Sequence, residues 1–168
     1  MATVTPINSW PVPVSTDLVK DGAVAIESLG DAIDASVGSG LLAWQSWAPT
    51  LSGGWVNGNG TWTAHYCKIG KTVHFAAQFT IGSTTTKLTN LIVSLPLTAA
   101  RVNFQTIGMV ASPNSIFGAY IGTTTTIFTY VVNAAATYGA RNTITATVPV
   151  TWSTSDVLYF SGTYETST

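Results

Sequence analysis

The sequence is poor in charged side chains, and this scarcity limits what the chain can do. Charged residues make up 8% of the 168 residues, and six basic against seven acidic side chains leave a formal charge of −1. A nucleic-acid binder needs a basic surface to displace counterions, so that function is disfavoured. About a quarter of the residues of an ordinary globular protein are charged, so we expect other subunits to cover much of this surface.

Cysteine and long apolar runs are also lacking. The single cysteine, Cys67, cannot form an intrachain disulfide, and we interpret it as a small buried strand residue. No apolar run approaches about 18 residues, so we expect no membrane insertion. The first residues have neither a basic start nor an apolar stretch, so we expect no secretory signal and synthesis in a reducing cytoplasm.

Residues for catalysis and metal binding are scarce as well. Outside residues 17–34 the carboxylates are Asp156 and Glu165, which we interpret as a turn residue and an exposed charge. His65 and Cys67 share a strand face, but neither C-x-x-C nor H-E-x-x-H is present. The motifs G-x-S-x-G and G-x-x-x-x-G-K-[ST] do not occur. The sequence therefore predicts no enzyme, no catalytic residue, no metal and no cofactor.

An extended arm is predicted over residues 1–16. Prolines at positions 6, 11 and 13 fix their own φ and disfavour helix in the residues before them. Trp10 lies inside this arm without a local partner. We interpret Trp10, together with Pro11 and Pro13, as an element that docks on another surface; the alternative is that it folds back on its own domain.

A short acidic helix is predicted over residues 17–38. Residues 15–17 supply N-cap chemistry, and the glycine-containing segment 37–40 ends the helix. A helix with one narrow apolar seam is marginal alone, so we expect it to self-associate in a short parallel bundle. The alternative is a single amphipathic helix packed on its own body. The seam at heptad spacing consists of Val19, Ile26, Leu29 and Ile33.

From residue 41 the pattern changes to a period of two. In 72–80, apolar Val73, Phe75 and Phe79 alternate with more polar neighbours, which is typical of a half-buried strand. Similar short runs follow one another, separated by turns rich in Gly, Asn and Ser. The sequence therefore predicts a mainly β protein, in which an antiparallel β-sandwich or jelly-roll domain spans 41–168.

Loops at the end of such a domain are the usual place for recognition. Tryptophan offers an apolar face to a sugar ring, and asparagine offers a donor and an acceptor to its hydroxyls. The alternative for Trp55 is packing in the core or in a subunit interface. The predicted ligand-binding residues are Trp55, Asn57, Asn59, Tyr138 and Arg141.

Three stretches carry a resemblance to a known group of proteins. The first is WPVP at 10–13, followed by STDLVKDGAVAI at 15–26. The second is WTAHYCKIGKTVHF at 62–75, and the third combines PVTW at 149–152, SD at 155–156 and GTYE at 162–165. In these stretches the sequence resembles the tail-fibre or minor tail proteins of siphophages, in particular those that infect actinobacteria.

The resemblance implies a homotrimeric virion protein of a phage tail or tail tip, made in the host cytoplasm. Trp10, Pro11 and Pro13 would attach it to other tail or baseplate proteins, and the helix would be the trimer interface. The β-domain would then act in host attachment, as a receptor-binding protein for a cell-envelope glycan that it does not cleave. Two alternatives stay open: a purely structural head or tail decoration protein, and an envelope polysaccharide depolymerase.

Overall fold

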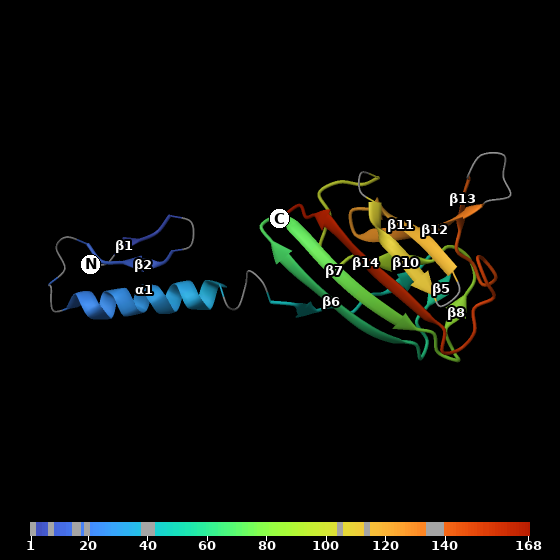
Figure 1. The fold of residues 1–168 in the computed structure, drawn as a ribbon, viewed down its shortest axis with the longest axis horizontal. Coiled ribbons are helices and arrows are strands. Elements are labelled where there is room, and N and C mark those ends of the chain that lie inside the picture. Colours follow the sequence, from blue (N-terminus) through green and yellow to red (C-terminus); the bar gives the residue numbers. More distant parts are fainter. Residues whose placement is uncertain are drawn as a thin grey trace. The chain divides into compact units, whose positions relative to one another are not determined.

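The chain divides into two compact units, and each is described by itself. The helical unit comprises Met1–Ala43 and the β unit comprises Trp44–Thr168. Figure 1 shows the elements of both units in a computed structural model. The residues that the structure describes are 3–6, 9–14, 18, 21–37, 43–103, 106–112, 115–133 and 140–168.

In the helical unit, the predicted arm forms a short hairpin. β1 (Thr3–Val4) pairs antiparallel with β2 (Pro11–Val12). The backbone N–H of Thr5 donates to the carbonyl of Trp10 at 2.9 Å, which closes the connection between the two strands. The two strands are extended as expected, but the turn between them reverses the chain.

Trp10 has a partner in its own unit. Its Nε1 donates to Oγ of Ser36 at 2.9 Å, and that hydroxyl donates in turn to the carbonyl of Ala32 at 2.8 Å. Trp10 and Pro11 are half-buried, whereas Pro13 is exposed. The hairpin therefore lies against the helix. The contact of the Trp10 indole with Ser36 agrees with the alternative in which Trp10 folds back on its own chain.

The helix, α1 (Gly22–Ser36), begins after Asp21 and packs against β2. None of its residues is fully buried. The stripe that contains Ser36 is half-buried, because it lies on the side of the hairpin. At alternating spacings of three and four, this covered stripe comprises Gly22, Ala25, Leu29, Ala32 and Ser36.

A second stripe, beside the covered one, is exposed. It contains Ile26, which is 65% exposed, and Ile33, which is 36% exposed. Of the predicted seam, these two residues share the exposed stripe, Leu29 belongs to the covered stripe, and Val19 lies outside the described residues. The exposed stripe has the same spacing and comprises Ala23, Ile26, Gly30, Ile33 and Val37.

The β unit is built from antiparallel strands, which confirms the prediction of a mainly β chain. Nine of its strands follow one another in a sheet in the order β3-β6-β7-β14-β10-β11-β12-β9-β4, and β13 pairs with β12 beside this path. β5 and β8 form a separate pair. The strands are β3 (Gln45–Ser46), β4 (Leu51–Ser52), β5 (Trp55–Val56), β6 (Thr61–Ile69), β7 (Thr72–Thr80), β8 (Thr86–Lys87), β9 (Ile92–Ser94), β10 (Thr106–Ser112), β11 (Ser115–Thr123), β12 (Thr126–Asn133), β13 (Ala140–Thr143) and β14 (Val157–Glu165).

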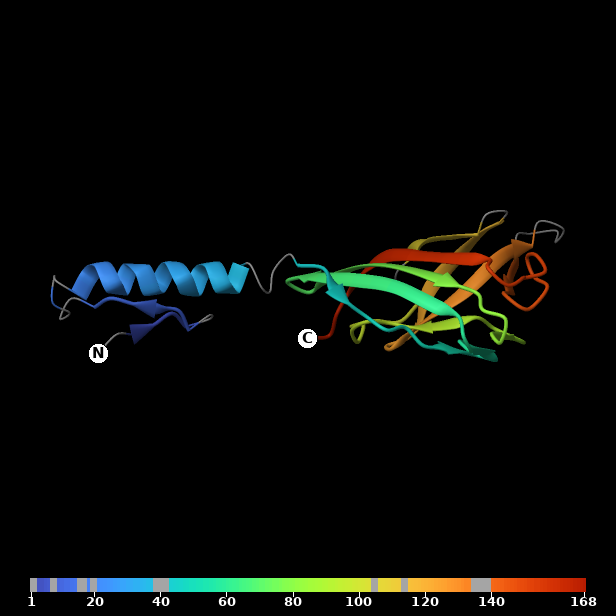
Figure 2. The ribbon, with the colours of Figure 1, turned by 90° about the horizontal axis from the view of Figure 1, so that it is seen from below.

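One short segment, residues 45–52, joins the two ends of the large sheet. Its first half pairs with β6, and the N–H of Trp47 donates to the carbonyl of Ala64 at 3.1 Å. Its second half pairs with β9, and the N–H of Ser94 donates to the carbonyl of Thr50 at 3.0 Å. The sheet therefore curves around a single core, as Figure 2 shows for the β unit.

Alternation along the strands decides which side chains enter this core. In β7, Val73, Phe75 and Phe79 are buried, as the period-two pattern predicts. Cys67 is free and buried in β6, which confirms its interpretation as a small buried strand residue. Among the described residues no helix is long and apolar enough to cross a membrane.

Candidate functional site

Trp55, predicted to stack on a ligand, belongs instead to the core. It is 1% exposed, and its Nε1 donates to the carbonyl of Thr89 at 2.8 Å. Its ring meets that of Trp152 edge to face, with centroids 6.3 Å apart. An indole has one donor, and here that donor is used while the ring is packed. The alternative reading of Trp55 as a core residue is therefore the one that holds.

Asn59, also predicted to contact a ligand, ties two turns together. Its Oδ1 accepts hydrogen bonds from the backbone N and the Oγ1 of Thr84, both at 2.9 Å. Its Nδ2 donates to Oγ of Ser83 at 3.1 Å. The neighbouring Asn57 accepts from Oγ1 of Thr85 through its backbone carbonyl at 2.7 Å. The turn that carries the two asparagines is thus fixed by contacts within the chain.

Arg141, another predicted ligand-binding residue, takes part in an aromatic cluster; Tyr138 lies outside the described residues. Arg141 is exposed on β13. Its guanidinium carbon lies 5.0 Å from the ring centroid of Tyr120 and 5.4 Å from that of Tyr130. At these distances a cation is attracted to the ring faces, and the attraction favours this position of the arginine head.

The aromatic cluster spreads over the outer face of β11 and β12. Tyr120 lies opposite Phe128 in the ladder, with ring centroids 5.7 Å apart. A Cβ on Gly118 would come within 2.5 Å of the Tyr130 ring, and one on Gly122 within 2.4 Å of the Phe128 ring. The two glycines therefore let the rings of β12 lie down on the neighbouring strand.

A depression of about 250 Å³ opens beside this cluster. Its polar lining includes the exposed side chains of Asn90 and Asn142. We call it the Arg141 depression. The residues around it are Asn90, Leu91, Ile92, Tyr120, Phe128, Thr129, Tyr130, Arg141, Asn142 and Thr143.

The same outer face continues as a second depression of about 270 Å³ on the other side of Tyr130. Its lining is apolar and includes Ile116, which is 64% exposed, and Val132, which is 58% exposed. Exposed apolar side chains that gather on one face of a protein make that face a candidate for binding. The two depressions share Tyr130, so they form one continuous surface.

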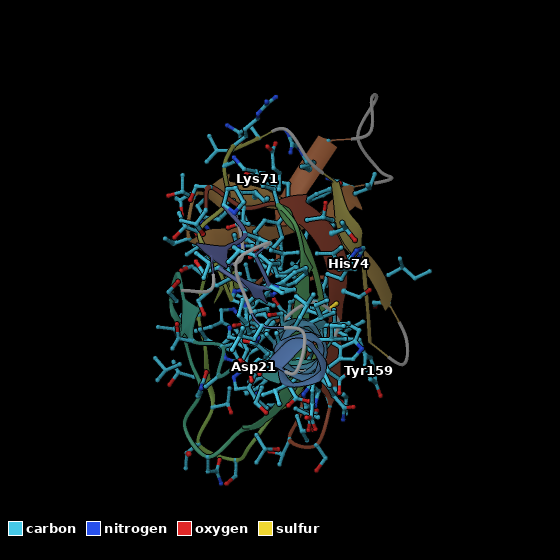
Figure 3. All side chains as sticks on the ribbon, turned by 90° about the vertical axis from the view of Figure 1, so that its left-hand side faces the viewer. Asp21, Lys71, His74 and Tyr159 are labelled. Carbon is cyan, nitrogen blue, oxygen red and sulfur yellow. The ribbon has the colours of Figure 1, made fainter. Side chains whose placement is uncertain are left out.

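A third depression, of about 380 Å³, lies on the outer face of β6, β7 and β14. Figure 3 labels His74 and Tyr159, which lie on the same side of the β unit. His74 Nδ1 is 3.0 Å from Oγ1 of Thr163, so the ring has a local partner. The side chains around this depression are mostly small and uncharged: Thr63, His65, Ala76, Ala77, Gln78, Tyr159, Phe160 and Ser161.

The two carboxylates of the β unit are held by local contacts. Asp156 accepts a hydrogen bond from the N–H of Ser153 at 2.7 Å through Oδ2, as a turn residue does. Glu165 lies 3.7 Å from Arg101, and both side chains are partly exposed. Among the described residues, no group of three or more His, Cys, Asp and Glu side chains is placed to hold a metal ion.

Tyr164 is a buried titratable side chain with a structural role. Its hydroxyl donates to the carbonyl of Leu97 at 2.7 Å and accepts from the N–H of Leu97 at 3.0 Å. Burial raises the pKa of Tyr164 to about 12, although the hydrogen bond to Leu97 acts in the opposite direction. The hydroxyl therefore fastens the loop at Leu97 to β14 and is not free for chemistry.

Sequence reasoning found Arg141 but missed its neighbours Tyr120, Phe128, Tyr130 and Asn142. The available signal was the pair of aromatic positions two apart in β12, together with two glycines four apart in β11, of which Gly118 lies opposite Tyr130. Such a pattern leaves rings without bulky neighbours on one face of a sheet.

No family model, curated protein or solved structure matches this chain.

Proposed function

We propose that this chain is a homotrimeric, non-enzymatic attachment protein of a phage tail. In this proposal the helical unit joins three copies and fastens them to other tail or baseplate proteins. The β unit, an antiparallel sandwich of the jelly-roll kind, then binds a glycan of the host cell envelope. The resemblance of residues 10–26, 62–75 and 149–165 to siphophage tail proteins supports the virion location.

The observation that carries the proposal is the exposed stripe of α1. Ile26 and Ile33 face away from the hairpin of their own chain and follow heptad spacing, with Gly30 between them. A stripe of this spacing fits an identical stripe on parallel copies of the same helix. In such a trimer the hairpin would cover the side of each helix that faces away from the other two helices, because it covers the adjacent stripe that contains Leu29.

Association would stabilise a helix that is marginal alone. Full burial of an isoleucine side chain is worth about 1.5–3 kcal/mol. Because Ile26 is 65% exposed in the single chain, its burial in a trimer contributes about 1–2 kcal/mol per copy. Ile33 at 36% exposure contributes about half as much.

The charge of the β unit supports an anionic envelope partner. From residue 35 onward there are five basic and two acidic side chains, a net charge of +3. The helical unit carries the other five acids, so the two units differ in sign. Three joined copies also multiply weak contacts, since the second and third sites bind at high effective concentration.

The proposal is tested by binding labelled full-length protein to a panel of actinobacterial cells. The variant Ile26→Asp with Ile33→Asp should be monomeric and should bind at least about 100-fold more weakly, because avidity is lost. The control is Val24→Asp, since Val24 is 63% exposed but lies off the stripe. It should bind as the wild type does. Failure of the wild type to bind any strain, or equal binding by the monomeric variant, contradicts the proposal.

A further inference from the structure

Arg141 is an exposed cation whose partners among the described residues are aromatic rings rather than carboxylates. Its guanidinium lies over the rings of Tyr120 and Tyr130, and no carboxylate in the described part of the chain forms an ion pair with it. Stacking on two rings leaves the edge of the guanidinium fork, with its N–H groups, available. A planar fork of this kind binds carboxylate and phosphate groups through two parallel hydrogen bonds.

The surroundings of Arg141 add an apolar floor and amide groups at the rim. Phe128 lies against Gly122 and lines the same depression, so it offers a ring to an apolar face of a ligand. Asn90 and Asn142 are exposed at the rim, and each amide offers donors and an acceptor. Cation, ring and amides therefore converge on a space of about 250 Å³.

We propose that the Arg141 depression binds an anionic glycan, whose pyranose ring packs on Phe128 while a carboxylate or phosphate on that unit pairs with Arg141. This inference rests on the proposed function and names the ligand class and the site. The depression is smaller than the roughly 300–1,000 Å³ of a pocket for a drug-sized molecule, so it suits one sugar unit at a time. Because the β unit has a net charge of +3, it attracts a polyanion over a longer range than Arg141 alone.

The test titrates full-length protein with three probes by calorimetry. These are an oligogalacturonate, which carries carboxylates, a neutral galactose oligosaccharide of the same length, and an oligosaccharide of sugar phosphates. The wild type should bind an anionic probe and not the neutral one. Comparison of the two anionic probes tells a carboxylate ligand from a phosphate ligand.

Arg141→Gln should weaken binding of the anionic probe roughly 10-fold to 100-fold, because a charge-assisted hydrogen bond is lost. Arg141→Lys should restore part of the affinity. The matched control is Lys71→Gln, which removes the same charge as Arg141→Gln. Lys71, labelled in Figure 3, is exposed at the β6–β7 turn and does not line this depression. It should bind within about 2-fold of the wild type.

Three outcomes with the purified protein overturn the inference, and a fourth comes from cell binding. The first is equal binding of the anionic probe by the wild type and Arg141→Gln. The second is equal loss in Arg141→Gln and Lys71→Gln, which would indicate attraction by net charge alone. The third is a change in the sedimentation mass of Phe128→Leu, which would make this face an interface between copies. If Arg141→Gln still binds cells as the wild type does, this site is refuted while the proposed attachment function stands.

Discussion

Replacing Asn59 with alanine is expected to destabilise the β unit without affecting ligand binding. The side chain of Asn59 makes three hydrogen bonds, two to Thr84 and one to Ser83. Each such bond contributes about 0.5–1.5 kcal/mol net, and exposure of Asn59 favours the lower half of that range. We therefore expect a loss of about 1.5–3 kcal/mol in the free energy of unfolding.

Urea unfolding followed by tryptophan fluorescence measures this loss, because several tryptophans, Trp55 among them, pack in the core of the β unit. A change of this size should lower the midpoint of thermal unfolding by roughly 5–12 °C. The matched control is Asn142→Ala, since Asn142 is exposed and its side chain makes no hydrogen bond within the described residues.

Ligand binding should respond to the two substitutions in the opposite way: Asn142→Ala should weaken it and Asn59→Ala should not. Asn142→Ala should leave stability within about 0.5 kcal/mol of the wild type and weaken binding of the anionic glycan a few-fold. Asn59→Ala should keep the wild-type affinity at temperatures where it is folded. A stable Asn59→Ala protein that has lost the ligand would refute the assignment of Asn59 to the turn.

Three further substitutions test the core and the aromatic surface. Tyr164→Phe should lower the free energy of unfolding by about 1–3 kcal/mol, because both backbone groups of Leu97 lose their partner. Since the pKa of Tyr164 is raised in the folded state to about 12, wild-type stability should fall as pH rises from 10 to 12, and urea midpoints across that range should show a smaller fall in the variant. Gly122→Ala should push the Phe128 ring from its place and weaken glycan binding in calorimetry, and it should also lower the unfolding midpoint, because the added Cβ would meet the base of that ring. Trp55→Ala should cost about 3–5 kcal/mol in urea unfolding, whereas an exposed Trp55 would cost less than 1 kcal/mol.

The strands were predictable from the sequence because their pattern is local. Residues 61–69 and the alternation of Val73, Phe75 and Phe79 identify β6 and β7, and the structure has both. The place of Trp55 was not predictable in the same way. Its glycine-rich surroundings are typical of an exposed loop, but its partner Trp152 lies nearly a hundred residues further along the chain.

The candidate site depended on long-range pairing as well. Tyr120 and Tyr130 lie on different strands, and Arg141 reaches them from β13. Alternation indicates that aromatic positions share a face, but it does not tell an inner face from an outer one when both carry rings. The heptad pattern of the helix likewise did not reveal which of its apolar residues are covered within the same chain. The hairpin covers Leu29 and leaves Ile26 exposed, so the predicted seam is split between two stripes.

The account depends most on the association of the exposed stripe of α1 with identical copies. Sedimentation equilibrium of the purified full-length protein tests this directly. We expect about three times the chain mass of 17.6 kDa, and a single chain mass when Ile26 and Ile33 are both replaced by aspartate. A wild-type protein that stays monomeric at micromolar concentration, with Ile26 exposed in solution, would contradict the account.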